Sequence, residues 1–107
     1  MSMKITSVEQ FKQVLADHPK VVADFFATWC GPCKMLSPIL EKVAEANADV
    51  CFVKIDTDEM PTRPLSIEYG IQYLPTLVFI KNGSVVNKEV GFSSQEELQA
   101  KLESVFA

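Results

Sequence analysis

Residues 21–34 of the chain read VVADFFATWCGPCK. The apolar part of this stretch, residues 21–27, is rich in Val and Phe, which is typical of a strand buried on both faces. Pro32 favours the first turn of a helix, where its missing N–H would have no partner in any case. The stretch therefore predicts a buried strand that leads into the start of a helix, with Cys30 and Cys33 at the junction.

Four helices are expected along the chain in addition to this strand. The helix after Cys33 should end near Asn47, and apolar residues recur along one face of it, namely Met35, Leu36, Ile39, Leu40, Val43 and Ala44. Residues 7–10 and 94–97 each have the spacing of a capping box, so they open a helix that reaches residue 16 and a C-terminal helix. A fourth, short helix should end at Gly70, because glycine suits the left-handed position after a helix.

Further strands are predicted over residues 50–55 and 76–80, and a weak first strand over residues 4–6. Asn82-Gly83 is the strongest short hairpin signal, so residues 85–90 should pair antiparallel with the strand before it. The order is then β-α-β-α-β-α-β-β-α. This order predicts an α/β domain in which helices flank a central mixed sheet.

The composition indicates one globular domain spanning residues 1–107. Apolar residues make up 48% of the 107 residues and charged residues 22%, which excludes disordered and fibrous classes. No apolar run reaches the roughly 18 to 20 residues that a membrane span requires. The net charge of −4 argues against nucleic acid or an anionic membrane as the main partner.

Three cysteines are too few, and odd in number, for a secreted disulfide framework. The first eleven residues contain neither the apolar region nor the cleavage site of a secretory signal. We therefore expect a cytoplasmic protein, and a close cysteine pair in a reducing compartment indicates catalysis or metal binding.

The spacing of Cys30 and Cys33 suits thiol–disulfide exchange. Gly31 lets the turn close, and Cys30 meets the unpaired N–H groups and positive end of the helix dipole, which favour a thiolate. Cys33 lies one turn further along, within reach of a disulfide. Cys30 can then attack a substrate disulfide, and Cys33 can resolve the mixed disulfide. A zinc site is the first alternative, although four ligands are needed and only Cys51 and His18 remain, and a structural pair without chemistry is the second.

Asp24 is a carboxylate inside an otherwise apolar strand. Burial without a partner raises the pKa of such a group and makes it a proton carrier near neutrality. The alternative is a structural aspartate held in a salt bridge.

Residues 21–34 resemble the signature of the thioredoxin family almost residue for residue. Leu74-Pro75-Thr76, Asn82-Gly83 and Gly91 match further landmarks of that family in the same order, so the resemblance covers the whole chain. It implies a thioredoxin fold and a protein-disulfide reductase without a bound cofactor. It also implies disulfide-containing protein substrates and regeneration by thioredoxin reductase at the expense of NADPH. Nothing in the sequence suggests an obligate assembly, so we expect a monomer. Disulfide isomerases typically carry histidine in place of Pro32, but an oxidase or isomerase stays an alternative, as does a non-catalytic binding or scaffold module.

The resemblance also implies roles for single residues. Asp24 would exchange a proton with Cys33 through water, Lys54 would pair with Asp24 unless it is a solvated lysine, and the Leu74–Pro75 peptide bond would be cis. Redox tuning is implied for Gly31, Pro32 and Lys54. Substrate binding is implied for Trp29, Ile71, Leu74, Pro75 and Gly91, where the alternative for Ile71 and Leu74 is core packing.

Two features depart from the family pattern. Tyr73 is bulky at a groove position that is often smaller, and residues 59–66 are about two residues longer than in bacterial relatives. Cys51 is expected to be a small core residue, and His18 has no assigned role.

Overall fold

A mixed five-stranded sheet, in the order β1-β3-β2-β4-β5, forms the centre of the computed structural model, which describes residues 2–107. Three strands run parallel, and they are β1 (Ser2–Lys4), β3 (Cys51–Asp56) and β2 (Lys20–Phe26). The hairpin of β4 (Thr76–Lys81) and β5 (Ser84–Val90) continues the sheet antiparallel to β2. The predicted element order and the α/β class are confirmed.

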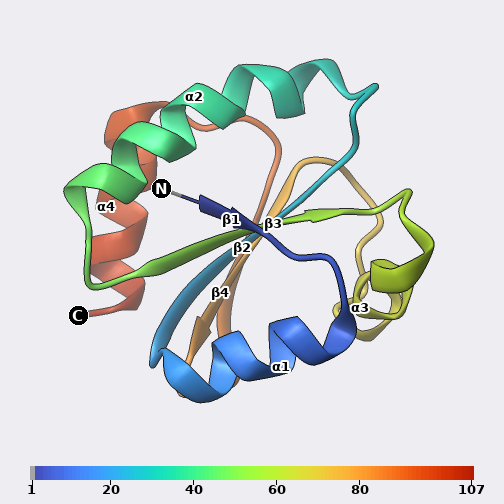
Figure 1. The fold of residues 1–107 in the computed structure, drawn as a ribbon. Coiled ribbons are helices and arrows are strands. Elements are labelled where there is room, and N and C mark those ends of the chain that lie inside the picture. Colours follow the sequence, from blue (N-terminus) through green and yellow to red (C-terminus); the bar gives the residue numbers. More distant parts are fainter. Residues whose placement is uncertain (1) are drawn as a thin grey trace.

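Two layers of helices cover the sheet (Figure 1). One face carries α1 (Val8–Asp17) and α3 (Arg63–Glu68), which follows the short 3₁₀ turn Met60–Thr62, and the other carries α2 (Gly31–Ala46) and α4 (Gln95–Val105). Side chains alternate along β2, so Val21 packs with the α1 side and Val22 with the α2 side. Both residues are fully buried, as the continuous apolar run predicted.

The first strand was predicted at residues 4–6, and this was wrong by two residues. Ser2 is held against the side of α2, because its N–H and hydroxyl both donate to the Glu41 carboxylate at 2.8 Å. After the end of β1, the Thr6 N–H donates to the Gln10 side chain at 2.7 Å. Thr6 is therefore not part of the strand. Gln10 thus reaches Thr6 rather than Ser7, while the Ser7 hydroxyl caps the helix as expected.

The predicted turns have the backbone that their residues favour. Asn82 and Gly83 take φ values of 51° and 81°, which join β4 to β5 in a tight hairpin. Gly70 has a φ of 62°, the left-handed conformation that lets the chain leave α3.

The capping box of α4 gives a direct test of these local rules. The Ser94 hydroxyl accepts from the Glu97 N–H at 3.1 Å, and the Ser94 N–H donates to the Glu97 carboxylate at 2.9 Å. We expect Ser94→Ala to lower the free energy of unfolding in urea by about 1 kcal/mol, because one helix N–H loses its acceptor. Ser93→Ala, one residue outside the cap, is the control and should cost less than about 0.5 kcal/mol. Equal losses in the two variants would contradict the capping role.

Candidate active site

The two cysteines lie at the start of α2, after the short loop that follows β2. Cys30 is the N-cap of α2, and its sulfur accepts a hydrogen bond from the Cys33 N–H at 3.2 Å. The pair is joined as a disulfide with the Cα atoms 5.3 Å apart, so the expected reach between them is confirmed. Both residues are 95% buried, and access to either sulfur depends on the cavities beside them.

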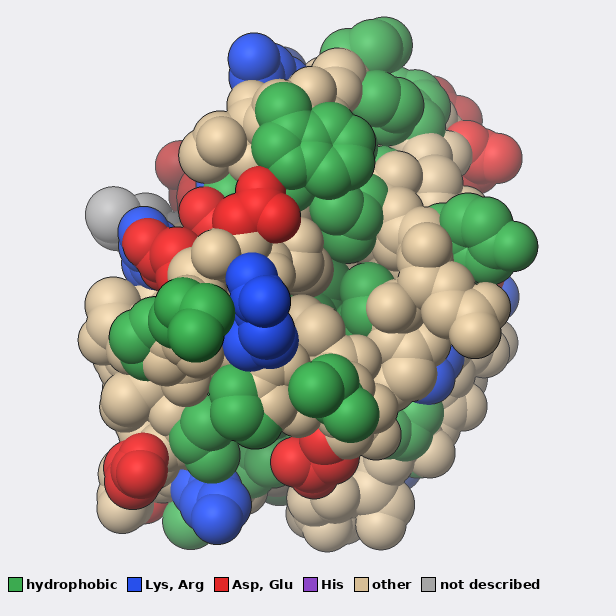
Figure 2. All heavy atoms as spheres, turned by 90° about the vertical axis from the view of Figure 1, so that its right-hand side faces the viewer, with side chains coloured by type: hydrophobic (Ala, Val, Ile, Leu, Met, Phe, Trp, Pro, Cys, Tyr) green, Lys and Arg blue, Asp and Glu red, His purple; other side chains and the backbone are tan. Residues whose placement is uncertain are grey.

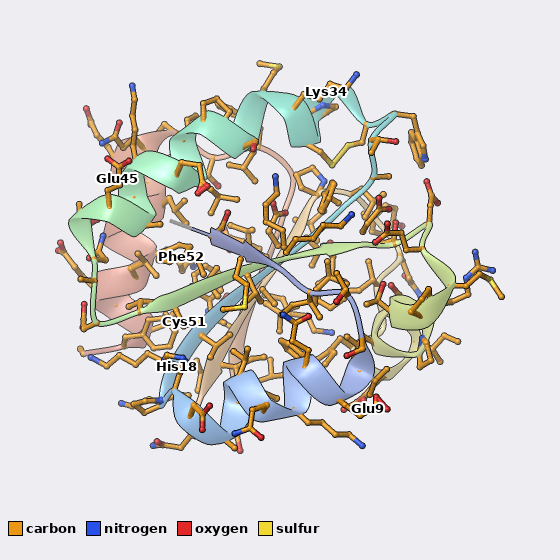
Figure 3. The ribbon with its side chains drawn as sticks, viewed as in Figure 1. Glu9, His18, Lys34, Glu45, Cys51 and Phe52 are labelled. Carbon is orange, nitrogen blue, oxygen red and sulfur yellow. A yellow bond between two sulfur atoms is a disulfide. The ribbon has the colours of Figure 1, made fainter. Side chains whose placement is uncertain are left out.

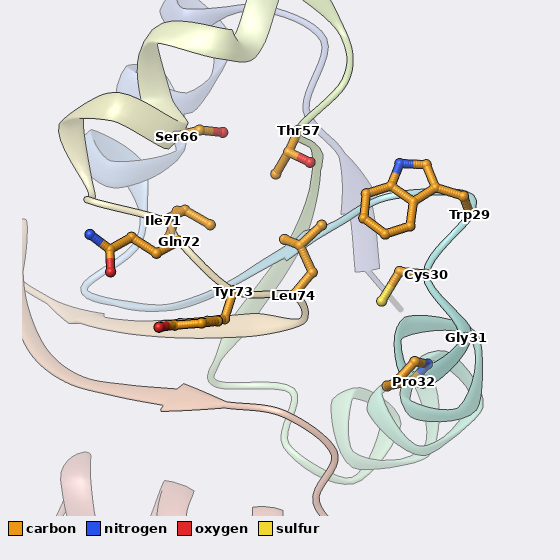
Figure 4. A pocket seen from close by; sticks show the side chains of 10 residues that line it. All are labelled: Trp29, Cys30, Gly31, Pro32, Thr57, Ser66, Ile71, Gln72, Tyr73 and Leu74. Atoms are coloured by element: carbon orange, nitrogen blue, oxygen red, sulfur yellow. The ribbon is translucent and has the colours of Figure 1, made fainter.

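Cys30 faces an open pocket of about 550 Å³ (Figure 4). The start of α2 forms one wall, and the loop before β4 forms the opposite wall. The lining residues are Trp29, Cys30, Gly31, Pro32, Thr57, Ser66, Ile71, Gln72, Tyr73 and Leu74. This pocket brings together three of the residues expected to bind substrate, namely Trp29, Ile71 and Leu74, with Pro32 of the cysteine motif.

Trp29 stands at the rim of the pocket with 69% of its surface exposed. Its indole N–H donates to the Asp58 carboxylate at 2.8 Å, which fixes the ring beside the disulfide. Tyr73 is similarly exposed, and its ring lies along the opposite wall (Figure 4). Around this end of the molecule, hydrophobic side chains alternate with acidic and basic ones (Figure 2).

Pro75 and Gly91, two further residues expected to bind substrate, are joined to each other. The Gly91 N–H donates to the Pro75 carbonyl at 2.8 Å, and Gly91 has a φ of 90°. The Leu74–Pro75 peptide bond is cis, as the resemblance implied. Leu74 alone of these three lines the pocket beside Cys30.

Cys33 faces a second, smaller cavity of about 220 Å³ on the other side of the disulfide. Its polar and charged lining comes from β2 and the loop after it, from β3 and from α2. It consists of Asp24, Thr28, Lys34, Ser37 and Lys54. Asp24 is 3% exposed, and its Oδ1 atom has no hydrogen-bond partner. Burial raises the pKa of Asp24 to about 7, against a lowering by the charge of Lys54 and a further rise from Glu41. The predicted buried carboxyl group with a near-neutral pKa is confirmed.

Lys54 lies beside Asp24 in the register of β2 and β3. Its ammonium group donates to the Ser37 hydroxyl at 3.1 Å and sits 4.8 Å from the centre of the Phe26 ring. The ion pairs found among residues 2–107 all lie elsewhere in the molecule. The alternative of a salt-bridged structural aspartate is therefore wrong. The direct pairing of Lys54 with Asp24 that the resemblance implied is wrong as well, because the ammonium group bonds to Ser37 and its charge acts on Asp24 without a direct bond.

Sequence reasoning missed Ser37 in the cavity and Asp58 beside Trp29. Ser37 follows Cys33 by four residues, so helical spacing alone places the two on one face and was an available signal. No pattern in the sequence points to Asp58, because its contact with Trp29 joins two separate loops.

Cys51 packs under the sheet, away from this site. Cys51 and Phe52 point to opposite sides of β3 (Figure 3), and the thiol packs partly buried on the α1 side. Burial raises the pKa of the Cys51 thiol, which keeps it protonated. His18 is the C-cap of α1.

Residues 2–107 contain neither a cluster of metal ligands nor a helix that could span a membrane. Within this range, no group of three or more His, Cys, Asp or Glu side chains is placed to hold a metal ion. None of the helices described here is both long enough and apolar enough to cross a membrane.

Known proteins resemble this chain over nearly its full length. The thioredoxin family model matches residues 2–104. A thioredoxin of Mycoplasmoides gallisepticum is 43% identical over 98 residues, which cover 92% of this chain and 96% of that protein. A thioredoxin of Malassezia sympodialis is 45% identical over 100 residues, with 92% of each chain covered.

Solved structures agree with the sequence comparison. The Malassezia sympodialis thioredoxin superposes with a TM-score of 0.88 at 42% identity, covering 100% of this chain and 92% of that one. Oxidised mitochondrial thioredoxin 3 of Saccharomyces cerevisiae gives a TM-score of 0.86 at 37% identity, with 96% and 94% covered. The chain therefore belongs to the thioredoxin family of thiol–disulfide oxidoreductases, and Cys30 and Cys33 form its dithiol pair.

Proposed function

We propose that the reduced Cys30–Cys33 pair reduces disulfides of protein substrates, with Cys30 as the attacking thiol and Cys33 as the resolving thiol. The observation that carries this assignment is that each cysteine faces a different cavity. Cys30 lies in the open pocket, where a substrate disulfide can approach it. Cys33 lies in the second, smaller cavity with the buried Asp24, called the inner cavity from here on, where a proton can be accepted.

The first step is attack by the Cys30 thiolate on one sulfur of the substrate disulfide. The substrate S–S bond breaks, a Cys30–substrate disulfide forms, and the second substrate sulfur leaves as a thiolate that takes up a proton. The helix N-terminus supports the Cys30 thiolate, because the Cys33 N–H already points at that sulfur. Gly31 and Pro32 tune this environment by shaping the first turn.

The second step needs the thiolate of Cys33. Its proton passes through water in the inner cavity to the Asp24 carboxylate, and Cys33 then attacks the sulfur of Cys30. The Cys30–Cys33 disulfide forms, and the substrate leaves with both sulfurs reduced. A carboxyl group with a pKa of about 7 suits this role, because it can accept and later return a proton near neutral pH.

Substrate binding is proposed along the open pocket. Trp29, Ile71 and Leu74 offer apolar contacts at its rim, and the backbone next to Pro75 and Gly91 continues the same edge. An extended segment of a substrate can pair with such backbone while its side chains contact the rim.

The product disulfide requires two electrons to return to the dithiol. We propose that thioredoxin reductase supplies them from NADPH, so that the chain itself binds no cofactor. We further propose that it works as a single-domain monomer in the cytoplasm, without nucleic acid or membrane as a partner. The net charge of −4 and the small number of cysteines support this setting.

The roles of the two cysteines can be separated with a disulfide-containing protein such as insulin. Cys30→Ser should abolish reduction, because the attacking sulfur is gone. Cys33→Ser should accumulate a mixed disulfide with the substrate, visible by mass spectrometry without reductant. Cys51→Ser is the matched control and should turn over like the unmodified protein. Normal turnover by Cys33→Ser would overturn the two-thiol mechanism.

Asp24→Asn removes the proposed proton acceptor and leaves the shape of the side chain. We expect release of substrate from the mixed disulfide to slow at least about tenfold at neutral pH, measured by rapid chemical quench. Asp17→Asn makes the same change on the exposed surface of α1 and should leave the rate unchanged. Equal rates in all three proteins would remove Asp24 from the mechanism.

The same substitution should change how stability depends on pH. The pKa of Asp24 is about 7 in the folded protein against 3.8 for an ordinary aspartate, so the folded state holds an extra proton between these values. Stability relative to Asp24→Asn should therefore fall as the pH rises from about 4 to about 7, and then level off. Above about pH 7, the free energy of unfolding of Asp24→Asn should exceed that of the unmodified protein by on the order of 4 kcal/mol. Urea unfolding of the oxidised proteins at a series of pH values measures this difference. A difference that stays constant with pH would contradict this prediction.

The reduction potential distinguishes a reductase from an oxidase or isomerase. We expect a value near about −270 mV, the reference value for thioredoxin itself, from equilibration in graded dithiothreitol buffers and counting of alkylated thiols. A value near about −180 mV, as in disulfide isomerase, would favour oxidation or isomerisation instead.

A further inference from the structure

The inner cavity contains a hydroxyl group that the mechanism above does not use. Ser37 lies on α2 one turn after Cys33, and both side chains line the cavity with Asp24 and Lys54. The Ser37 hydroxyl oxygen accepts the hydrogen bond from the Lys54 ammonium at 3.1 Å. Ser37 thus connects the helix that carries the cysteines to the strand beside Asp24.

Electrostatic attraction alone would place the Lys54 ammonium group next to Asp24 rather than next to Ser37. Asp24 is its neighbour in the strand register, is almost fully buried, and leaves Oδ1 without a partner. A direct ion pair would satisfy that oxygen, yet the ammonium group bonds to α2 and lies over the Phe26 ring instead. The hydroxyl of Ser37 competes with the carboxylate for the same ammonium.

We propose that Ser37 is a positioning residue, which holds the Lys54 ammonium against α2 and so prevents it from pairing directly with Asp24. This inference rests on the proposed function in that Asp24 is the group that exchanges a proton with Cys33. As a consequence, the charge of the Lys54 ammonium group acts on Asp24 across the cavity without a direct bond. The Asp24 carboxylate then remains free to take up a proton.

Of the groups that surround Asp24, Lys54 is the charged one that bonds to Ser37. From α2, Cys33 and Lys34 line the cavity, and the Glu41 carboxylate acts from further along the helix, where it is bound to Ser2. From β4, the paired residue is the apolar Leu77. From β3, the group is Lys54 itself, and its contact with Ser37 decides how closely it can approach Asp24.

The test is a double-mutant cycle read out on Asp24 itself. In the oxidised protein, where Cys33 carries no proton, carbon-detected NMR of the side-chain carboxyl group follows the titration of Asp24. Ser37→Ala should lower the pKa of Asp24 by about one unit, because the released ammonium moves next to the carboxylate. In the Lys54→Gln background, Ser37→Ala should have no effect on that pKa, since there is no ammonium left to position.

Ser37→Thr is the matched control, because it keeps the hydroxyl and should keep the pKa of Asp24 unchanged. In the reduced protein, Ser37→Ala should also shift the pH profile of mixed-disulfide resolution to lower pH by the same amount. An unchanged or raised pKa in Ser37→Ala would overturn the proposal. So would a shift that persists in the Lys54→Gln background, because Ser37 would then act on Asp24 by its own hydroxyl.

This readout separates the positioning role from the proposed function. The NMR titration requires no substrate and no turnover, so it reports on Ser37 even if the reductase assignment fails. Conversely, loss of the pH shift in resolution alone, with the NMR shift intact, would place the fault in the role of Asp24.

Discussion

The burial of β2 between two layers of helices is the constraint on which the rest of the molecule depends. This strand has neighbours on both edges and helices on both faces. An apolar side chain in its buried part therefore stabilises the fold, whereas a polar or charged one costs free energy of folding. Val21 and Val22 meet the constraint simply, one on each face. Asp24 does not meet it, because its carboxyl group is buried and leaves the Oδ1 atom without a hydrogen-bond partner.

Opposing effects set the pKa of the buried Asp24. Desolvation is the largest influence on its pKa, and the charge of Lys54 opposes it without a direct bond. A closer lysine would favour the carboxylate and weaken its hold on a proton, whereas a more distant lysine would leave the carboxyl group protonated at neutral pH. The proposed role of Ser37, whose hydroxyl bonds to this lysine, is to set the distance between the ammonium group and the carboxylate.

The disulfide separates two environments that differ in size and in the residues that line them. On the side of Cys30 the surface is open, partly apolar and bordered by the fixed ring of Trp29, which suits contact with another protein. On the side of Cys33 the cavity is small and lined by ionisable groups, which suits transfer of a proton. A single helical turn between the cysteines thus separates the open pocket from the cavity that holds the buried Asp24.

Patterns within the sequence determined the elements and the chemistry of the cysteine pair. The apolar run of residues 21–27, the capping serines and the Asn82-Gly83 turn all act over a few residues, so they are readable without the fold. The first strand was displaced because the side chains of Glu41 and Gln10 take up Ser2 and Thr6, and these contacts are not visible in local periodicity. Only the tertiary structure decided which cavity each cysteine faces and that Lys54 bonds to Ser37 rather than to Asp24. Those outcomes depend on side chains from β2, β3 and α2 that are brought together by sheet register and helix packing, interactions that no single stretch of the chain contains.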